Sequence, residues 1–441
     1  MTIKYRLSFL VLLTALFMGG TTGPVMAKVY IDIEAPGFQQ FPIAICDFQI
    51  KQPQSALPPD SGVAVADNIR HYLGLSGIFN LLDKKSFLEG IEPGVPENIR
   101  FPDWSAIGAD FLLRGDIAIK GKEVTVESRL YEITRGQTLF NKKYAGKTDD
   151  LQALACNITA DILLALTGDE GDFNTQIAFV IKKNTGSDIY TMNYDASDIK
   201  NLTHHHSIVM APRWSPDGQY FAFTSYKNGR PEVFLRHLKT GKEKRVSSFR
   251  GLNLCGSFSP DSKKLLLTLS KDNNEEIYVL DIDTLALTRL TNSFSIDVSP
   301  AWSPDGKKIA FVSNRSGSPQ IFTMDADGNN VKRITYEGNY NTSPSWSPRG
   351  GRIAYEGLIN HKYQIFAIDE EGGNLIQLTF DNADNEYPSW SPSGRQIVFS
   401  SGLGSKSRIS IMNSNGLNPR VLKEQKEQWV MPAWSPRLKE K

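Results

Sequence analysis

The sequence has little cysteine and almost no net charge. It holds three cysteines in 441 residues, and its 49 basic and 48 acidic side chains leave a formal net charge of +1. Nucleic-acid-binding domains usually carry a clustered basic excess, so its absence argues against that class. Because no CxxC pair is present, neither a redox dithiol nor a cysteine-bound zinc site is predicted. Cys46 and Cys156 could form a disulfide, but we favour buried free thiols, since an isolated cysteine is commonly a small core residue.

Recognisable catalytic motifs are also absent. The chain contains no GxSxG, no HExxH, no Walker loop and no GxGxxG placed between a strand and a helix. The one histidine cluster, His204-His205-His206, could present His204 and His206 on the same side of an extended segment and so hold a metal. We favour a solvated loop instead, because no carboxylate or cysteine lies close in the sequence to complete a coordination shell. The sequence thus predicts no catalytic residue, no cofactor and no metal site.

Long apolar runs are missing except at the N-terminus. Leu7 to Met18 is apolar, follows Lys4 and Arg6, and precedes the small-residue stretch that ends at Ala27. This order is typical of a cleavable secretory signal, which we place at residues 1–27. The run is shorter than the roughly 20 residues that span a bilayer, although an uncleaved anchor is the alternative. No other segment reads as apolar enough to cross, so we expect an exported, soluble protein.

The dominant feature of the sequence is a repeat of 44 residues. Six aromatic residues, each followed by Ser-Pro, stand 44 positions apart without an insertion: Trp214, Phe258, Trp302, Trp346, Trp390 and Trp434. Between the anchors, short runs of alternating apolar residues are separated by Gly-containing turns such as Ser-Pro-Asp-Gly at 215–218. Four strands in each unit of this length are typical of a propeller blade. We expect each anchor to pack between neighbouring blades, because a functional residue is seldom needed six times.

The two ends of the repeat region are complementary. No anchor strand lies 44 residues before Trp214, yet apolar residues at Ile177, Phe179 and Ile189 fall at the expected later positions. The last repeat is a single orphan strand, Met431 to Ser435. Pairing that strand beside Ile177 to Ile181 would complete a sixth blade and leave no open edge. Residues 176–441 are therefore predicted to form a closed six-bladed β-propeller.

Residues 28–168 lack the repeat and predict a small α/β domain. Strands are expected at 41–48, 109–119, 124–133 and 137–144, and a helix at 61–73. A second helix should begin at an N-cap on Thr148, carry an apolar stripe from Leu151 to Leu166 and stop at Gly168. The polar segment 169–175 is predicted to be a linker.

Function is expected where the repeats differ from one another. The loops that lead into the innermost strands vary most, and they should ring one mouth of the channel as a docking surface for a protein. Trp429 on this rim would suit an interface anchor. The predicted docking residues are Met210, Asn253, Leu254, Asp297, Val298, Asn341, Thr342, Asn385, Glu386, Trp429 and Val430.

The order of a secretory signal, an α/β domain, a short linker and six repeats that end in Pro432-Ala433-Trp434-Ser435-Pro436 resembles the TolB family. This resemblance covers nearly the whole chain. It implies a periplasmic protein of the Tol–Pal system, which supports outer-membrane integrity and cell division. Two partners are implied, the outer-membrane lipoprotein Pal at the propeller face and the inner-membrane protein TolA at the start of the mature chain.

The resemblance transfers to only a few residues. The TolA-binding extension would fall on Lys28, Val29, Tyr30, Ile31, Asp32 and Ile33. Asn253 matches an Asn of the family, whereas Leu252 stands where a His is expected.

Two other functions remain as alternatives. A propeller hydrolase or lactonase would need a carboxylate or histidine cluster with a metal in the channel. A carbohydrate-binding surface would need exposed aromatic residues on the rim.

Overall fold

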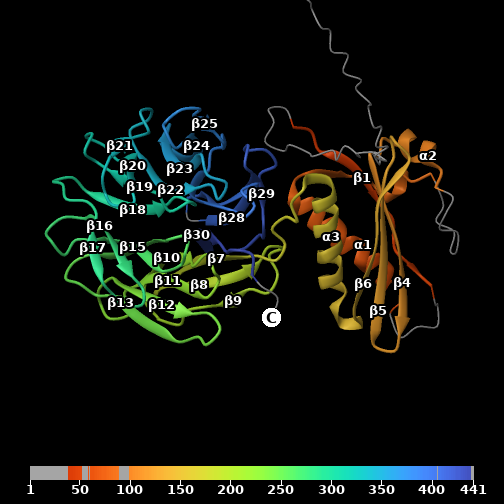
Figure 1. The fold of residues 1–441 in the computed structure, drawn as a ribbon, viewed down its shortest axis with the longest axis horizontal. Coiled ribbons are helices and arrows are strands. Elements are labelled where there is room, and N and C mark those ends of the chain that lie inside the picture. Colours follow the sequence, from red (N-terminus) through yellow and green to blue (C-terminus); the bar gives the residue numbers. More distant parts are fainter. Residues whose placement is uncertain (1–37, 52–57, 59, 89–98, 405, 439–441) are drawn as a thin grey trace, which may run out of the picture.

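The computed structural model describes residues 38–51, 58, 60–88, 99–404 and 406–438. An N-terminal α/β domain lies beside a β-propeller (Figure 1). The predicted signal at residues 1–27 and the predicted TolA-binding segment at residues 28–33 lie outside the described residues. The predicted fold, an α/β domain followed by a six-bladed propeller, is confirmed.

A mixed sheet forms the N-terminal domain. Strand β1 (Phe41–Ile45) is parallel to both of its neighbours, β3 (Phe79–Leu81) and β4 (Phe111–Lys120). Strands β5 (Glu123–Glu132) and β6 (Gln137–Lys147) continue from β4 in antiparallel order, and the short β2 (Gln49–Ile50) also pairs with β4. The helices are α1 (Ser61–Ser76), α2 (Phe101–Ala106) and α3 (Leu151–Thr167), with 3₁₀ turns η1 (Lys84–Ser86) and η2 (Thr148–Asp150).

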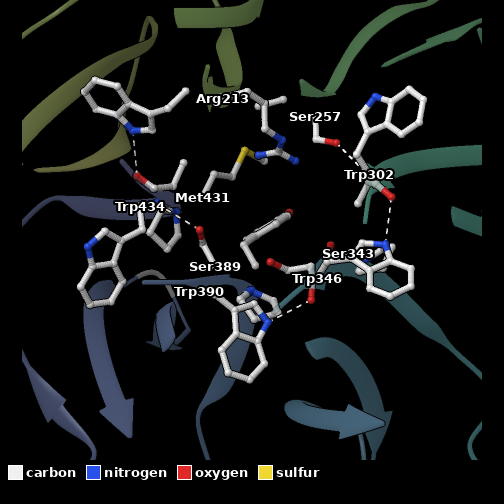
Figure 2. A pocket seen from close by; sticks show the side chains of 18 of the residues that line it. Arg213, Ser257, Trp302, Ser343, Trp346, Ser389, Trp390, Met431 and Trp434 are labelled. Atoms are coloured by element: carbon white, nitrogen blue, oxygen red, sulfur yellow. Dashed lines mark hydrogen bonds between the residues drawn. The ribbon is translucent and has the colours of Figure 1, made fainter. Parts of the chain in front are cut away.

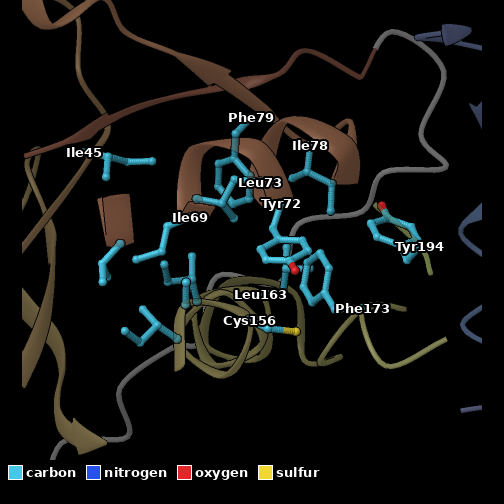
Figure 3. Close-up of a cluster of buried hydrophobic side chains, with 14 of the residues drawn as sticks. Ile45, Ile69, Tyr72, Leu73, Ile78, Phe79, Cys156, Leu163, Phe173 and Tyr194 are labelled. Carbon is cyan, nitrogen blue, oxygen red and sulfur yellow. The ribbon is translucent and has the colours of Figure 1, made fainter. Parts of the chain in front are cut away.

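Helices α1 and α3 cover one face of this sheet and pack on each other. Ile69 and Leu73 of α1 and Leu163 of α3 are buried between them (Figure 3). The predicted cap of α3 on Thr148 is wrong, because a 3₁₀ turn occupies 148–150 and the helix begins one turn later. Gly168 ends the helix in the left-handed conformation, as expected. Residues 148–167 are long and apolar enough to cross a membrane by composition, which the sequence reading missed, yet half of that stretch is buried in the domain core.

Each blade of the propeller is a four-stranded antiparallel sheet. Five blades, in chain order, are β10–β13, β14–β17, β18–β21, β22–β25 and β26–β29, and the sixth combines β30 with β7, β8 and β9. The innermost strands are β10 (Val209–Trp214), β14 (Asn253–Phe258), β18 (Asp297–Trp302), β22 (Asn341–Trp346), β26 (Asp384–Trp390) and β30 (Gln428–Trp434). The second strands are β11 (Tyr220–Ser225), β15 (Lys264–Leu269), β19 (Lys308–Ser313), β23 (Arg352–Ile359), β27 (Gln396–Leu403) and β7 (Gln176–Lys183).

The outermost strand of each blade is the shortest. The third strands are β12 (Glu232–His237), β16 (Glu276–Asp281), β20 (Gln320–Asp325), β24 (Lys362–Asp369), β28 (Lys406–Asn413) and β8 (Gly186–Asn193). The outermost strands are β13 (Glu243–Ser247), β17 (Leu287–Arg289), β21 (Lys332–Arg333), β25 (Ile376–Gln377), β29 (Arg420–Val421) and β9 (Lys200–Asn201).

The ring closes as the sequence predicts. Strand β30 pairs antiparallel with β7, so that Trp434 lies opposite Ile177 and Val430 opposite Val180. The backbone N–H of Gln176 also donates to Ser435 Oγ at 2.8 Å, across 259 residues of sequence. This pairing removes the free edge that an incomplete blade would expose.

The segment 169–175, predicted as a polar linker, buries three of its residues: Asp172, Phe173 and Thr175. Phe173 stacks edge-on against both Tyr72 of α1 and Tyr194 of the sixth blade, at centroid distances of 5.6 and 5.5 Å (Figure 3). One continuous cluster of buried side chains runs from the N-terminal sheet to Trp434. The domains therefore share a core.

Polar contacts to backbone groups fix this arrangement. Tyr194 Oη donates to the Leu75 carbonyl at 2.7 Å, and Gln396 Nε2 donates to the same carbonyl at 2.8 Å. Asn413 and Asn418 both donate to the carbonyl of Gly77, which ends α1. These partners belong to the fifth and sixth blades, so the N-terminal domain is held against one side of the ring.

Candidate protein-binding face and channel

The innermost strands line a central channel with a cavity of about 500 Å³. Counted from the residue five places before each aromatic anchor, the third residue has a positive φ of 52–55° in five blades (Ala211, Ser299, Ser343, Tyr387 and Met431), and a proline follows it each time. A β-bulge results, which shifts the register to the second strand. The exception is β14, where Cys255 and Gly256 hold these positions and the register shifts after Cys255.

The aromatic anchors do not face the channel. Figure 2 shows the indole rings pointing outward, away from its centre, between blades. Trp346 Nε1 donates to the Ala301 carbonyl of the preceding blade at 3.0 Å, and Trp390 Nε1 to the Ser345 carbonyl at the same distance. Trp214 Nε1 makes the equivalent bond to the Ala433 carbonyl. The expectation that the anchors join neighbouring blades is confirmed for these three.

The first residue in this count is buried in every blade, and where it is polar it supports a loop. The predicted docking residues at this position, Asn253, Asp297, Asn341 and Asn385, are at most 3% exposed. Asn253 Oδ1 accepts hydrogen bonds from Ser247 Oγ and from the Phe249 N–H, at 2.7 and 3.0 Å. Asp297 Oδ2 pairs with Arg315 at 2.7 Å. As a set these side chains hold the rim in place and do not present a surface to a partner.

Trp429 lies in a different environment from the one predicted. It occupies the same first position in the sixth blade and was expected on the exposed rim, but it is only 4% exposed. Its ring packs on Phe179 of β7 with centroids 4.5 Å apart. The neighbouring Val430 is 5% exposed and belongs to the core between the sixth and first blades. The expectation that Trp429 lies outside the blade packing is wrong.

The second residue in the same count faces the channel mouth in the first five blades. Met210 and Leu254 line the channel, and Val298 and Thr342 are half-buried beside it. Glu386 is the charged member of this set. Burial, followed by repulsion from Glu356 and Asp384, raises the pKa of Glu386 to about 7.

Glu356, on β23, lies next to Glu386 and is almost fully buried. Its Oε1 accepts from Thr342 Oγ1 at 2.5 Å and its Oε2 accepts from the Tyr387 N–H at 2.8 Å. Burial raises the pKa of Glu356 as well. The mouth of the channel therefore holds two carboxyl groups that protonate more readily than free glutamate.

Exposed apolar side chains gather in the loops that lead from the outermost strand of one blade to the innermost strand of the next. We call these the rim loops, residues 202–208, 248–252, 290–296, 334–340, 378–383 and 422–427. The first five carry large exposed apolar residues: Ile208, Phe249, Phe294, Ile296, Tyr336, Tyr340 and Phe380. Phe294 is fully exposed. Sequence reasoning did not name these residues as docking candidates, because it chose residues that belong to the first part of the innermost strands.

The rim loops lie at the end of the ring opposite the N-terminal domain. Since strands alternate in direction within a blade, the Trp-Ser-Pro turns and the rim loops are at opposite ends. The N-terminal domain contacts the Trp-Ser-Pro turn of the fifth blade and the turns after β8 and β28. The rim face is thus left uncovered by the described residues, as a protein-docking surface requires.

One residue of the histidine cluster, His205, makes polar contacts within the first blade, whereas the whole cluster was expected to be a solvated loop. The side chain of His205 is 8% exposed, with Nδ1 2.8 Å from Ser225 Oγ and Nε2 3.0 Å from Glu243 Oε2. This order resembles a nucleophile, base and carboxylate, but Ser225 is fully buried and Lys227 also binds the Glu243 carboxylate. No group of three metal-binding side chains occurs among the described residues. The arrangement stabilises the first blade and offers no route for a substrate to Ser225.

The three cysteines, Cys46, Cys156 and Cys255, are buried and form no disulfide with one another, which is the alternative that the sequence favours.

The fold and this face define a class, a six-bladed β-propeller with an appended α/β domain and an exposed apolar rim. The profile of the TolB beta propeller domain matches residues 164–438, and that of the TolB amino-terminal domain matches residues 29–139. The chain belongs to the TolB family.

Individual proteins similar to this chain are also TolB proteins. The Tol-Pal system protein TolB of Syntrophus aciditrophicus is 45% identical over 213 residues, which is 46% of this chain and 46% of the relative. That of Geobacter sulfurreducens is 38% identical over 222 residues, 49% and 50% of the two chains. These matches span about half the length of the curated relatives. The crystal structure of TolB from Acinetobacter baumannii superposes with a TM-score of 0.80 at 29% identity, covering 90% of this chain and 97% of that one.

Proposed function

We propose that this protein is the periplasmic protein-binding scaffold of a Tol–Pal envelope complex. In this role it links a Pal-like outer-membrane lipoprotein to a TolA-like inner-membrane protein and supports outer-membrane integrity and cell division. The relatives are named for that system. The proposal includes no catalytic step, because the one Ser-His-Glu arrangement in the described residues is buried.

The observation that carries the proposal is the apolar rim. Phe249, Phe294, Tyr336 and Phe380 project from four successive rim loops on a face that the N-terminal domain leaves free. Exposed aromatic side chains gathered on one surface mark protein interfaces, where they supply much of the binding energy. We assign the Pal-like partner to this face, with Met210, Leu254, Val298, Thr342 and Glu386 at its centre. The TolA-like partner is assigned to residues 28–33.

The test is binding of a purified Pal-like lipoprotein, without its lipid, to the full chain. Phe294→Ala removes a fully exposed ring, so it should leave the melting temperature unchanged. It should weaken binding by ~30-fold, because truncating an interface aromatic costs roughly 2 kcal/mol or more. Val331→Ala is the matched control, since Val331 is exposed in the turn before β21 at the opposite end of the ring. If the variants Phe294→Ala and Leu254→Arg both bound the Pal-like lipoprotein normally, the rim face would be ruled out as its binding surface.

Deletion of residues 28–33 should abolish binding of the TolA-like protein and leave binding of the Pal-like protein intact. Loss of both would show that the two surfaces are not separate.

A further inference from the structure

The innermost strands carry one residue that breaks the pattern of the channel wall. The residue directly before the aromatic anchor, the fifth in the count used above, has a small side chain in five blades: Ser257, Ala301, Ser345, Ser389 and Ala433. In the first blade it is Arg213. Figure 2 shows the guanidinium of Arg213 pointing inward, beside the sulfur of Met431. With small residues on the other strands, the long side chain has room to reach toward the middle of the channel.

The charge of Arg213 has no partner of opposite sign. Its recorded hydrogen bond runs to the carbonyl of its neighbour Pro212, at 2.9 Å. No carboxylate forms an ion pair with Arg213 among the described residues, and no acidic side chain lines the cavity around it, since Glu356 and Glu386 lie at the channel mouth near the start of β26. Burial lowers the pKa of this guanidinium, which shows that the position disfavours an isolated charge.

Serine hydroxyls around the same cavity have unused protons. Ser257 Oγ accepts the Trp302 N–H at 2.7 Å, and Ser389 Oγ accepts the Trp434 N–H at 3.0 Å. Neither hydroxyl donates to an acceptor within the described part of the chain. Figure 2 shows both serines at the channel wall, on different sides of the ring.

We propose that the propeller channel is a binding site for a carboxylate, held by Arg213 and by hydroxyl donors such as Ser257 and Ser389. A guanidinium offers parallel N–H donors that match the two oxygens of a carboxylate. A single positive charge neutralises a carboxylate but would leave a doubly charged phosphate group uncompensated. The carboxylate comes either from a small free acid or from an acidic side chain of a peptide segment that enters the channel. Arg213 lines the same cavity as Met210 and Leu254 of the rim face, but the carboxylate site does not depend on the proposed partners.

The experiment measures binding to the full chain by calorimetry at constant ionic strength. The probes are N-acetyl-aspartate amide and the peptide acetyl-Ala-Asp-Ala-amide, each compared with its asparagine counterpart. The aspartate probes should bind about 10–100-fold more tightly than the asparagine probes, as expected for charge-assisted hydrogen bonds. Equal binding of the aspartate and asparagine probes would overturn the proposal. The ratio of the dissociation constants of N-acetyl-aspartate amide and the aspartate peptide tells whether the channel prefers a small free acid or a peptide side chain.

Two variants and a control complete the test. Arg213→Ser installs the residue found in three other blades, so it should fold, and it should lose the preference for aspartate. Arg213→Lys should keep part of that preference, because it retains the charge but not the paired donors. Arg250→Ser, at an exposed rim position, should bind like the wild type.

Without ligand, Arg213→Ser should melt about 2–4 °C higher, because an unpaired, half-buried charge is removed. A lower melting temperature would mean that the guanidinium already has an internal partner, and this would overturn the proposal. Unchanged aspartate binding by Arg213→Ser would overturn it as well.

Discussion

Glu386 and Trp429 show how neighbouring positions of the same repeat acquire different roles. Both belong to innermost strands, Glu386 as the residue that faces the channel mouth and Trp429 as the buried residue at the first position. The β-bulge that follows gives the next residue a positive φ in five blades. Side-chain direction around the channel thus depends on one backbone irregularity in each strand.

The raised pKa of Glu386 should make stability depend on pH. Its folded-state pKa of about 7 lies above the ordinary value of 4.5. Between these values the folded chain keeps a proton that the unfolded chain releases, so the free energy of unfolding falls as pH rises from about 4.5 to 7. Allowing for solvent screening of this half-buried group, the loss should be roughly 1–2 kcal/mol.

Urea denaturation at pH 5 and pH 8 should therefore show a smaller pH effect in Glu386→Gln than in the wild type. The neutral side chain should also make this variant the more stable of the two at pH 8. Glu427→Gln, exposed in the sixth rim loop, serves as the control. An unchanged pH profile in Glu386→Gln would show that other groups, such as Glu356, carry the effect.

Replacing Trp429 should affect stability and not primarily binding. Trp429→Ala removes a buried ring that packs on Phe179, and should lower the free energy of unfolding by about 3–5 kcal/mol. Trp429→Phe keeps an aromatic ring and removes an indole N–H that has no recorded partner in the described structure, so it should cost less than about 1.5 kcal/mol. Denaturation curves of both variants test this. A fully stable Trp429→Ala would return Trp429 to the list of docking residues.

At the scale of elements, the blades were predictable because each strand and turn recurs with the same spacing. A period of 44 residues fixed the number of blades, and the unequal ends of the repeat indicated the pairing of β30 with β7. The directions in which the Asn253 and Trp429 side chains point were not predictable. The bulge interrupts the alternation of side chains between the two faces of a sheet, which the sequence analysis assumes for a regular strand. The role of Asp172 also escaped notice, since it contacts a residue far away in the sequence.

Asp172 completes a turn of another element. In the first three blades an Asp accepts from the Ser of its own Trp-Ser-Pro or Phe-Ser-Pro turn, as Asp217 does from Ser215 at 2.6 Å. The fifth blade has Ser393 at the Asp position. Asp172, from the segment between the domains, accepts from the Ser393 N–H at 2.9 Å and from Ser393 Oγ at 2.5 Å. A carboxylate supplied from outside the blade thus attaches the N-terminal domain to the ring.

A double-mutant cycle at this turn should show strong coupling. Asp172→Ala leaves buried donors of Ser393 unpaired and should cost about 1–3 kcal/mol. Ser393→Asp alone should also destabilise, because it places a second carboxylate beside a buried one whose pKa is already raised by burial. Asp172→Ser combined with Ser393→Asp restores the repeated turn within the blade and should recover most of the loss. Additive effects in denaturation experiments would contradict the shared contact.

At the scale of the whole molecule, the two domains share a core and the ring depends on its last described strand. Buried residues of α1 and α3, the 169–175 segment and the sixth blade form one cluster. The sixth blade also contains the junction between β7 and β30. Attachment of the N-terminal domain and closure of the propeller are therefore made in the same region of the structure.

Ending the chain at residue 427 should prevent stable folding. This truncation removes β30, which exposes the edge of β7 and deletes Trp434 from the core. We expect little soluble protein on expression, because an unpaired inner edge invites aggregation. A chain ending at residue 438 keeps β30 and should behave like the full protein. Equal yields and equal melting temperatures for the two truncations would show that closure is dispensable.

The pairing of β30 with β7 also sets the timing of events while the chain is being made. A ribosome adds roughly 5–20 residues per second, so on the order of tens of seconds separate the synthesis of these two strands. During that interval a nascent chain can complete five blades and still carry one open sheet edge. Such a chain requires protection by a chaperone, or delayed folding, until its final strand has emerged. The emergence of β30, more than any earlier local folding step, thus becomes the event that commits the propeller to its native state.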